Sequence, residues 1–230
     1  ENAAGMAAGL AIGGRKPVFA VYSTFLQRAI DQLIVNNALM NLDVVFAIDR
    51  AGLVGADGPT HHGMFDLVYT RMVPNMRVLA PSNEAELVNS LHTALVLGGP
   101  FAVRYPRGEA CGVPVPDKPE TYEPGVSRLV REGSDVVILA FGNMVEPANE
   151  AAAALEEAGL SVRVVDMRWV KPLDTEAIRK ASETRLVVTV EDGVAAGGVG
   201  EEVLAELARQ NEKVPVLTLG IPDRYIMQGA

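Results

Sequence analysis

One segment of the chain, Arg50–Met64, combines residues that bind anions with residues that transfer protons. It contains one arginine, one carboxylate, two adjacent histidines and four glycines, and it directly follows the apolar run Val44–Ile48, which is typical of a buried strand. Glycine and proline permit tight turns at strand ends, and open α/β sheets bind ligands at the carboxyl ends of their strands. We therefore predict that Arg50, Asp57 and His61 contribute to a ligand site rather than to a plain solvated turn.

Two further segments carry polar and aromatic side chains after predicted strands. Tyr22–Arg28 begins a predicted helix, and Arg104–Gly108 follows another strand of the first half. Because the carboxyl ends of parallel strands share one edge of a sheet, these groups can converge on one site. Arg50 and Arg107 suit a phosphate or a carboxylate, since the guanidinium group matches planar oxyanions. The aromatic side chains of the first segment could equally belong to the core.

The elements that must position these residues follow an alternating pattern. Short apolar runs alternate with helix-like segments, which favours mostly parallel sheets covered by helices on both faces. One helix is expected from Ser23 or Thr24 to about Met40, and Ser82 is expected to cap another that ends near Leu97. The expected strands cover residues 18–22, 44–48, 77–80, 101–105, 135–141, 162–166, 186–190 and 214–219.

A proline-rich stretch divides this pattern into two parts. Gly108–Gly125 contains four prolines and few apolar residues, and is typical of a semi-rigid linker. The predicted fold class is therefore α/β, with two three-layer αβα domains that cover residues 1–120 and 121–230. Helices are also expected at residues 3–14, 146–158, 174–181 and 199–209.

Composition excludes several classes of protein. The 230 residues carry a net charge of −9 and no long basic run, so nucleic acid is not an expected partner. No apolar run approaches the roughly 20 residues of a membrane span. The single cysteine, Cys111, fits a reducing compartment, and we predict a cytoplasmic protein.

No metal site is expected from the residue pattern. His61 and His62 are adjacent, and neighbours in sequence rarely ligate one ion; the sequence has no HExxH motif and no cysteine pair. The glycine-rich stretch Gly197–Gly200 precedes a predicted helix. We interpret it as a tight structural turn rather than as an anion site.

Longer strings resemble the 1-deoxy-D-xylulose-5-phosphate synthase family of the transketolase-like superfamily. The resemblance covers nearly all residues in the right order, and the strings at 22–28 and 49–63 are highly specific. The matching strings are YSTFLQR at 22–28, DRAGLVGADGPTHHG at 49–63, RYPRG at 104–108, RWVKPLD at 168–174 and GIPD at 220–223.

That family uses thiamine diphosphate and Mg²⁺ to decarboxylate pyruvate and join the two-carbon fragment to D-glyceraldehyde 3-phosphate, for isoprenoid precursor synthesis. The resemblance implies a homodimeric transferase, of which residues 1–120 are the pyrimidine-binding domain and 121–230 the C-terminal domain, shortened at its end. Phe25 would stack on the aminopyrimidine ring, and Arg28 would complete the wall around it.

The resemblance also implies roles at the substrate site. Tyr22, Arg50 and Arg107 would hold the phosphate of glyceraldehyde 3-phosphate. Asp57 and His61 would be catalytic: both would line the site, and His61 would contact substrate oxygens or relay protons.

Two family features are missing from the sequence. The Gly-Asp-Gly motif that binds diphosphate and magnesium is absent, so an absent N-terminal domain is expected to hold that metal. A gapless alignment places the family's catalytic glutamate just before Glu1, and a one-residue slip would place it at Glu1. We therefore expect an inactive fragment or one subunit of a split enzyme. The alternatives are a thiamine-dependent 2-oxoacid dehydrogenase β subunit, another transketolase-like enzyme, or a non-catalytic dimerising scaffold.

Overall fold

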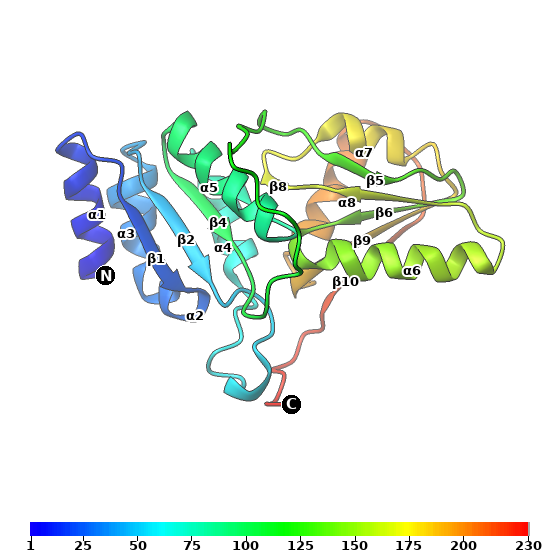
Figure 1. The fold of residues 1–230 in the computed structure, drawn as a ribbon, viewed down its shortest axis with the longest axis horizontal. Coiled ribbons are helices and arrows are strands. Elements are labelled where there is room, and N and C mark those ends of the chain that lie inside the picture. The colour runs from blue at the N-terminus through cyan, green and yellow to red at the C-terminus, as the bar shows by residue number, and fades with distance from the viewer. Residues whose placement is uncertain (230) are drawn as a thin grey trace.

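The computed structural model describes residues 1–229 and contains two five-stranded sheets, each covered by helices on both faces (Figure 1). The predicted α/β class is confirmed. Of the predicted elements, β1 (Val18–Tyr22), β7 (Val162–Asp166) and α8 (Val199–Arg209) have the expected bounds.

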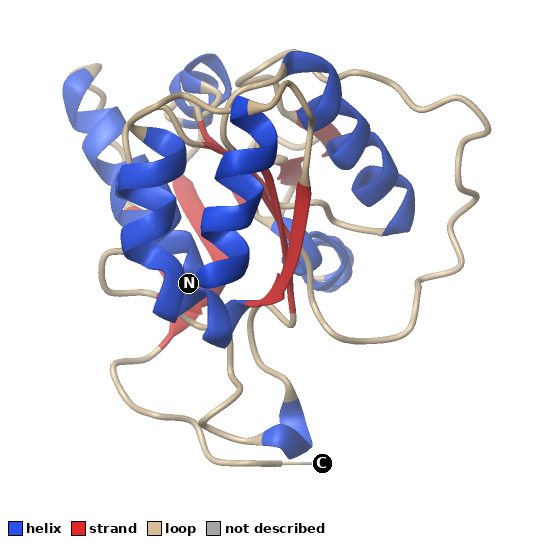
Figure 2. Ribbon diagram, turned by 90° about the vertical axis from the view of Figure 1, so that its left-hand side faces the viewer, coloured by secondary structure: helices blue, strands red, loops and turns tan. Residues whose placement is uncertain are grey.

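The first sheet has the strand order β1-β2-β4-β3-β8, and its first four strands are parallel. Phe46 and Ile48 of β2 pack on one face with α1 and the helices after β1, whereas Val45 packs on the other face with α5. A central parallel strand buried on both faces reads as a continuous apolar run, as this one does. Figure 2 shows helices lying over these strands. The bounds are β2 Val45–Asp49, β3 Arg77–Leu79, β4 Phe101–Arg104, α1 Asn2–Ile12, α4 Asp66–Met72 and α5 Glu84–Leu97.

The second sheet has the order β10-β9-β6-β7-β5, with β5 antiparallel at its edge. Helix α6 packs against one face, and α7 and α8 pack against the other. The bounds are β5 Arg128–Arg131, β6 Val136–Ala140, β9 Leu186–Val194, β10 Val216–Ile221, α6 Val145–Glu157 and α7 Thr175–Ala181.

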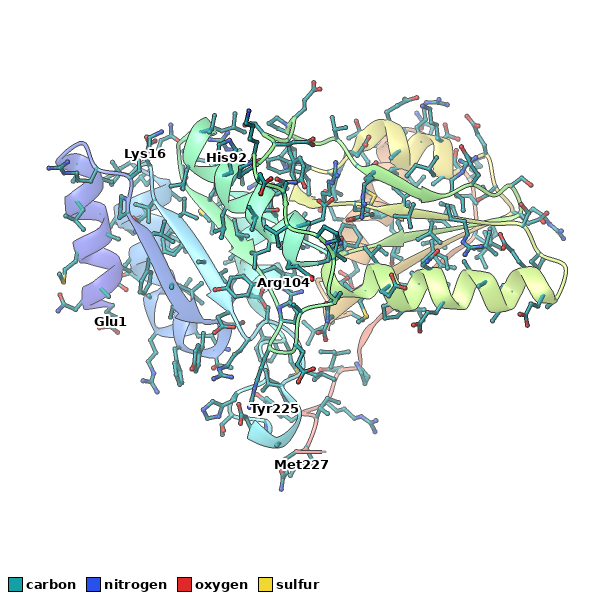
Figure 3. All side chains as sticks on the ribbon, viewed as in Figure 1. Glu1, Lys16, His92, Arg104, Tyr225 and Met227 are labelled. Carbon is teal, nitrogen blue, oxygen red and sulfur yellow. The ribbon has the colours of Figure 1, made fainter. Side chains whose placement is uncertain are left out.

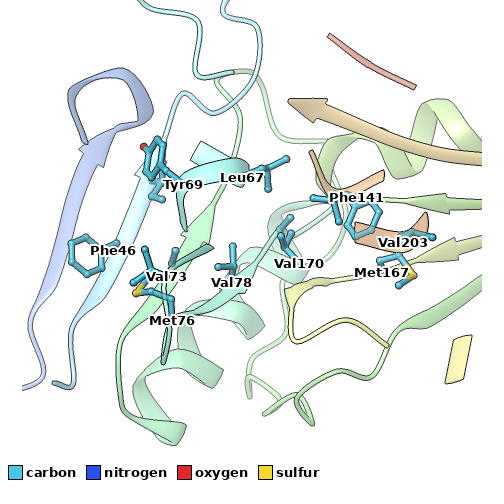
Figure 4. Close-up of a cluster of buried hydrophobic side chains, with 14 of the residues drawn as sticks. Phe46, Leu67, Tyr69, Val73, Met76, Val78, Phe141, Met167, Val170 and Val203 are labelled. Carbon is cyan, nitrogen blue, oxygen red and sulfur yellow. The ribbon is translucent and has the colours of Figure 1, made fainter. Parts of the chain in front are cut away.

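The two halves share one strand and one core. Strand β8 (Trp169–Lys171) leaves the second half and pairs antiparallel with β3 of the first sheet. A single buried apolar cluster also runs from Phe46 and Val78 in the first half to Phe141 and Val203 in the second (Figure 4). The halves are therefore packed through a common hydrophobic interior.

The prediction of one continuous helix at 23–40 is wrong. The segment is a series of short pieces: α2 (Ser23–Leu26), a 3₁₀ turn (Gln27–Ala29), α3 (Ile30–Gln32) and a π-helical stretch (Leu33–Ala38). The Asn37 side chain donates to the backbone oxygen of Gln32 at 2.7 Å, so it competes for a carbonyl that a regular helix would use.

The predicted cap of α5 is also wrong. Asn83 caps the helix, because its side chain accepts from the backbone N–H of Glu86 at 3.0 Å. The Ser82 hydroxyl instead donates to Asp166 of the second half at 2.8 Å. Helix α7 lies within the predicted range 174–181, and Asp174 caps it by accepting from the backbone N–H of Ala177 at 2.8 Å.

Residues 105–127 contain no helix or strand, as expected for a linker. The linker is nevertheless fixed to α5, since the backbone N–H groups of Glu120 and Tyr122 donate to Asn89 and Thr93 at 2.9 Å. In the described part of the chain, no helix has the length and apolar character needed to cross a membrane.

Candidate functional site

The loop from Arg50 to Gly63 begins where β2 ends, and its neck is closed by two backbone hydrogen bonds. The N–H of Gly52 donates to the oxygen of Gly63 at 2.8 Å, and the reverse bond is 2.7 Å long. Gly63 fits only without a side chain, because a Cβ there would lie 2.4 Å from the Arg50 oxygen. The neck thus sets the path of the chain that carries Arg50, Asp57 and His61.

Four of the predicted side chains meet in one cluster at the edge of the first sheet. The Arg50 Nη2 donates to the Tyr22 hydroxyl at 2.8 Å, and the Arg50 guanidinium lies 4.1 Å from the Tyr22 ring centroid. Arg107 Nη1 donates to Asp57 Oδ2 at 2.6 Å, and Arg50 Nη1 lies 3.9 Å from the same oxygen. Two guanidinium groups therefore converge on one oxyanion. The hydrogen bond with Tyr22 is the main cause of the raised pKa of Arg50.

An aromatic wall adjoins this cluster. The rings of Tyr22 and Phe25 are stacked with centroids 5.3 Å apart, and the His61 ring meets Phe25 edge-on at 5.7 Å. The Arg28 guanidinium lies 6.0 Å from the Phe25 centroid, and Phe25 is 43% exposed. An aromatic ring left open to solvent beside the Arg28 guanidinium offers a surface on which a flat ring can stack.

His61 and His62 differ although they are neighbours. His61 is half-buried, and its Nδ1 lies 2.9 Å from the Thr60 hydroxyl. His62 is buried, and its Nδ1 accepts the backbone N–H of Val54 at 3.0 Å. His62 therefore fixes the loop from inside, while His61 lies beside the aromatic wall.

A buried ion pair beneath the cluster was not predicted from the sequence. Arg104 Nε donates to Asp66 Oδ2 at 2.7 Å, and the Ser23 hydroxyl donates to Asp66 Oδ1 at 3.1 Å. Burial lowers the pKa of Arg104, but the charge of Asp66 and its hydrogen bond, together with the charges of Asp192 and Glu191, outweigh burial and raise that pKa. Burial raises the pKa of Tyr69, whose hydroxyl donates to the Ser23 oxygen. The sequence did offer one signal, because Arg104 ends an apolar strand. A buried arginine is paired with an acidic partner, so a buried ion pair could have been expected there.

A cavity of about 530 Å³ lies between the two halves at this edge. Arg50 and Arg107 line it from the first half, and Asn143 and Glu146 line it from the second. Of the predicted residues, only Arg50 and Arg107 line the cavity. Asp57 contacts both of them from outside the cavity lining, and the remaining predicted residues, Tyr22, Phe25, Arg28 and His61, form the aromatic wall. Figure 3 shows Arg104 where the halves meet.

The glycine-rich stretch at 197–200 is a structural turn, as interpreted from the sequence. The buried Glu191 carboxylate accepts the backbone N–H of Gly200 at 2.9 Å and so caps α8 from within the chain. Burial raises the pKa of Glu191. Cys111 is exposed. Within residues 1–229, no group of three or more histidine, cysteine, aspartate or glutamate side chains could hold a metal ion.

Comparison with known families divides the chain into two parts. The model described as "Transketolase, pyrimidine binding domain" matches residues 1–112, and "Transketolase, C-terminal domain" matches residues 125–230.

Curated relatives match the whole chain. The 1-deoxy-D-xylulose-5-phosphate synthase of Chlorobium luteolum is 52% identical over all of this chain, and that of Vibrio vulnificus is 50% identical. The chain spans 37% and 36% of the lengths of these two relatives.

Solved structures share the fold. A split-gene transketolase, described as an inactive beta4 tetramer, superposes with a TM-score of 0.84 at 32% identity and covers 96% of this chain and 71% of its own. The transketolase of Campylobacter jejuni superposes with a TM-score of 0.71 over 93% of this chain and 32% of its own, at 22% identity. At that identity the second likeness concerns the fold alone.

Proposed function

The chain belongs to the transketolase family, and we propose that it forms the pyrimidine-binding and C-terminal domains of a thiamine-diphosphate-dependent 1-deoxy-D-xylulose-5-phosphate synthase. The reaction would condense pyruvate with D-glyceraldehyde 3-phosphate and release CO2, supplying isoprenoid precursors. The observation that carries this proposal is the convergence of Arg50 and Arg107 on the single Asp57 oxygen. We place the boundary between the domains near residue 120, in the linker.

The phosphate of glyceraldehyde 3-phosphate would take the place that the Asp57 carboxylate holds between the two guanidiniums. Arg50, Arg107 and the Tyr22 hydroxyl together donate enough hydrogen bonds for a phosphate dianion, and charge-assisted bonds from arginine are the stronger kind. Asp57 would then move away from Arg107. Because Asp57 and His61 lie on the same loop, substrate binding would shift both side chains. His61 would contact a substrate oxygen or move a proton there.

The residues of this chain fit the pyrimidine half of thiamine diphosphate. The exposed ring of Phe25 supplies a stacking face, and Arg28 and His61 flank it. When bound, the cofactor supplies the carbanion chemistry. The described residues offer no cluster for a metal ion, so Mg²⁺ would be held by the part of the relatives that this chain does not span.

A homodimer is the proposed working unit, whereas the split-gene relative is described as an inactive beta4 tetramer. Without the portion found in its longer relatives, this chain is expected to have no turnover of its own.

The test is turnover of pyruvate plus glyceraldehyde 3-phosphate, with thiamine diphosphate and Mg²⁺, on the full-length gene product and on this chain. Activity in the full-length product alone supports the proposal. Saturable cofactor binding without this activity would indicate another thiamine enzyme, such as a 2-oxoacid dehydrogenase β subunit. Absence of both would indicate a non-catalytic scaffold.

A further inference from the structure

An aspartate from the second half of the chain reaches the loop that carries the substrate-site residues. Asp192 lies in β9, and its Oδ1 accepts the backbone N–H of Leu53 at 3.3 Å. Its Oδ2 accepts the side-chain amide of Asn143 at 3.1 Å. Both carboxylate oxygens are thus used, one toward the loop and the other within the second half.

The contact with the loop is also steric. A Cβ placed on Gly52 would lie 1.7 Å from Asp192 Oδ2, and Gly52 has a φ of +79°. Only glycine adopts that backbone readily and leaves room for the carboxylate. Gly52 lies two residues after Arg50 and forms the neck of the loop with Gly63. A displacement of the backbone at Gly52 therefore displaces Arg50.

Asp192 is itself held in place. It is 9% exposed, and its backbone oxygen accepts from Arg104 Nη2 at 2.9 Å. Arg104 is fixed in turn by the buried pair with Asp66. Asn143, the side-chain partner of Asp192, lines the cavity that Arg50 and Arg107 also line. A buried, fully paired polar group specifies one arrangement, because its alternatives leave unsatisfied bonds.

We propose that Asp192, supported by Asn143, is a positioning residue through which the C-terminal domain fixes the Arg50–Gly63 loop and sets the affinity for the phosphorylated substrate. His62 holds the same loop from inside through Val54, whereas Asp192 holds it from the other domain. The structural part of this inference stands on the contacts alone. Its consequence for the substrate rests on the proposed function.

The first experiment measures hydrogen exchange in the peptide that covers the loop. In Asp192→Ala, the amide of Leu53 is expected to exchange about tenfold faster, the effect of losing one hydrogen bond. Asp192→Asn keeps both bonds, since its oxygen still accepts from Leu53 and the Asn143 amide can flip to accept. It should exchange like the parent. Glu150→Ala, which removes an exposed carboxylate of α6 away from the loop, is the matched control.

The second experiment measures KM on the full-length enzyme. Asp192→Ala should raise KM for glyceraldehyde 3-phosphate about tenfold and change KM for pyruvate by less than about twofold. Asp192→Asn, which keeps both bonds, should retain the parent KM for both substrates. If Asp192→Ala fails to fold, Asn143→Ala, which removes only the supporting bond, replaces it in both measurements.

The outcomes separate the two proposals. Unchanged exchange in the alanine variant overturns the positioning role, whatever the enzyme does. Equal changes in both KM values in Asp192→Ala, or an equally raised KM for glyceraldehyde 3-phosphate in Asp192→Asn, overturn the link to phosphate affinity. Faster exchange in Asp192→Ala but not in Asp192→Asn supports the positioning role. If the enzyme then has no synthase activity, the proposed function is overturned while the positioning role stands.

Discussion

Arg104 and Arg107 lie three residues apart, and each binds an aspartate at nearly the same distance, yet the two pairs occupy different environments. The Arg104–Asp66 pair is 2.7 Å long with side chains 3% and 1% exposed. The Arg107–Asp57 pair is 2.6 Å long with side chains 48% and 32% exposed. The buried pair connects Ser23, the start of α4 and the second half, whereas the exposed pair joins the Arg50–Gly63 loop to Arg107, which lines the cavity.

The comparison shows that ion-pair geometry alone does not identify a site. Removing one partner of a buried pair leaves a charge without solvent, which is costly, whereas an exposed pair exchanges its partner for water or for a ligand at little cost. The buried pair therefore acts as a structural support, and the exposed pair is able to release Arg107 to a substrate.

The largest expected effect is on stability. Arg104→Ala should lower the free energy of unfolding by about 3–5 kcal/mol, since it leaves Asp66 buried and unpaired. Urea denaturation followed by circular dichroism measures this. Arg107→Ala serves as the control and should change stability by less than about 1 kcal/mol. Equal losses in the two variants would contradict the distinction between the pairs.

The next effect is on the substrate. Arg107→Ala in the full-length enzyme should raise KM for glyceraldehyde 3-phosphate by the equivalent of about 1.5–3 kcal/mol, as expected for a lost charged hydrogen bond, with little change for pyruvate. Arg107→Lys should fall between the parent and the alanine variant, because it keeps the charge but loses the fork geometry. Steady-state kinetics with each substrate varied in turn decides this, and a parallel rise in both KM values would count against the assignment.

A smaller effect concerns anion binding. Asp57→Asn should tighten the binding of inorganic phosphate by about fivefold, since the removed charge competes for Arg107 with roughly the energy of an exposed pair. Isothermal titration calorimetry on the chain is the measurement. Weaker binding in this variant would show that Asp57 helps to hold the anion rather than occupying its place.

The smallest effect is the energy of the exposed pair itself. A double-mutant cycle on Arg107 and Asp57 should give a coupling of about 0.2–1 kcal/mol that declines at about 1 M salt. The same cycle on Arg104 and Asp66 should keep most of its coupling at that salt concentration, because the buried pair is poorly screened. The same salt dependence for the two pairs would contradict the distinction between a buried and an exposed ion pair.

Much of the fold could be predicted because its signals are local. Most of the parallel strands are short, mainly apolar runs, and helix α8 has a clear amphipathic pattern, so β1, β7 and α8 were predicted to the residue. The cap of α5 was not, since Ser82 and Asn83 are both good caps. The choice depends on Asp166, which lies far away in the sequence and draws the Ser82 hydroxyl away.

For the site, too, local signals could be predicted from the sequence and long-range contacts could not. The loop at 50–64 and the two arginines were recognisable from residue types after strands, and the structure places them together. Asp66 and Asp192 were not recognised, because their importance comes from contacts with Arg104 and Leu53, which are 38 and 139 residues away in the sequence. Only the three-dimensional arrangement distinguishes such carboxylates from surface ones.

Strand β8 has a practical consequence for dividing this gene. Residues 169–171 complete the first sheet against β3, and the buried indole of Trp169 lies 6.1 Å from the Phe101 ring. A recombinant fragment that stops at residue 120 would leave β3 with an open, apolar edge, the kind that invites aggregation. Expression of the N-terminal half on its own should therefore yield insoluble material unless a peptide spanning residues 168–174 is supplied with it. The linker between the two domains is therefore an unsuitable boundary for a recombinant fragment.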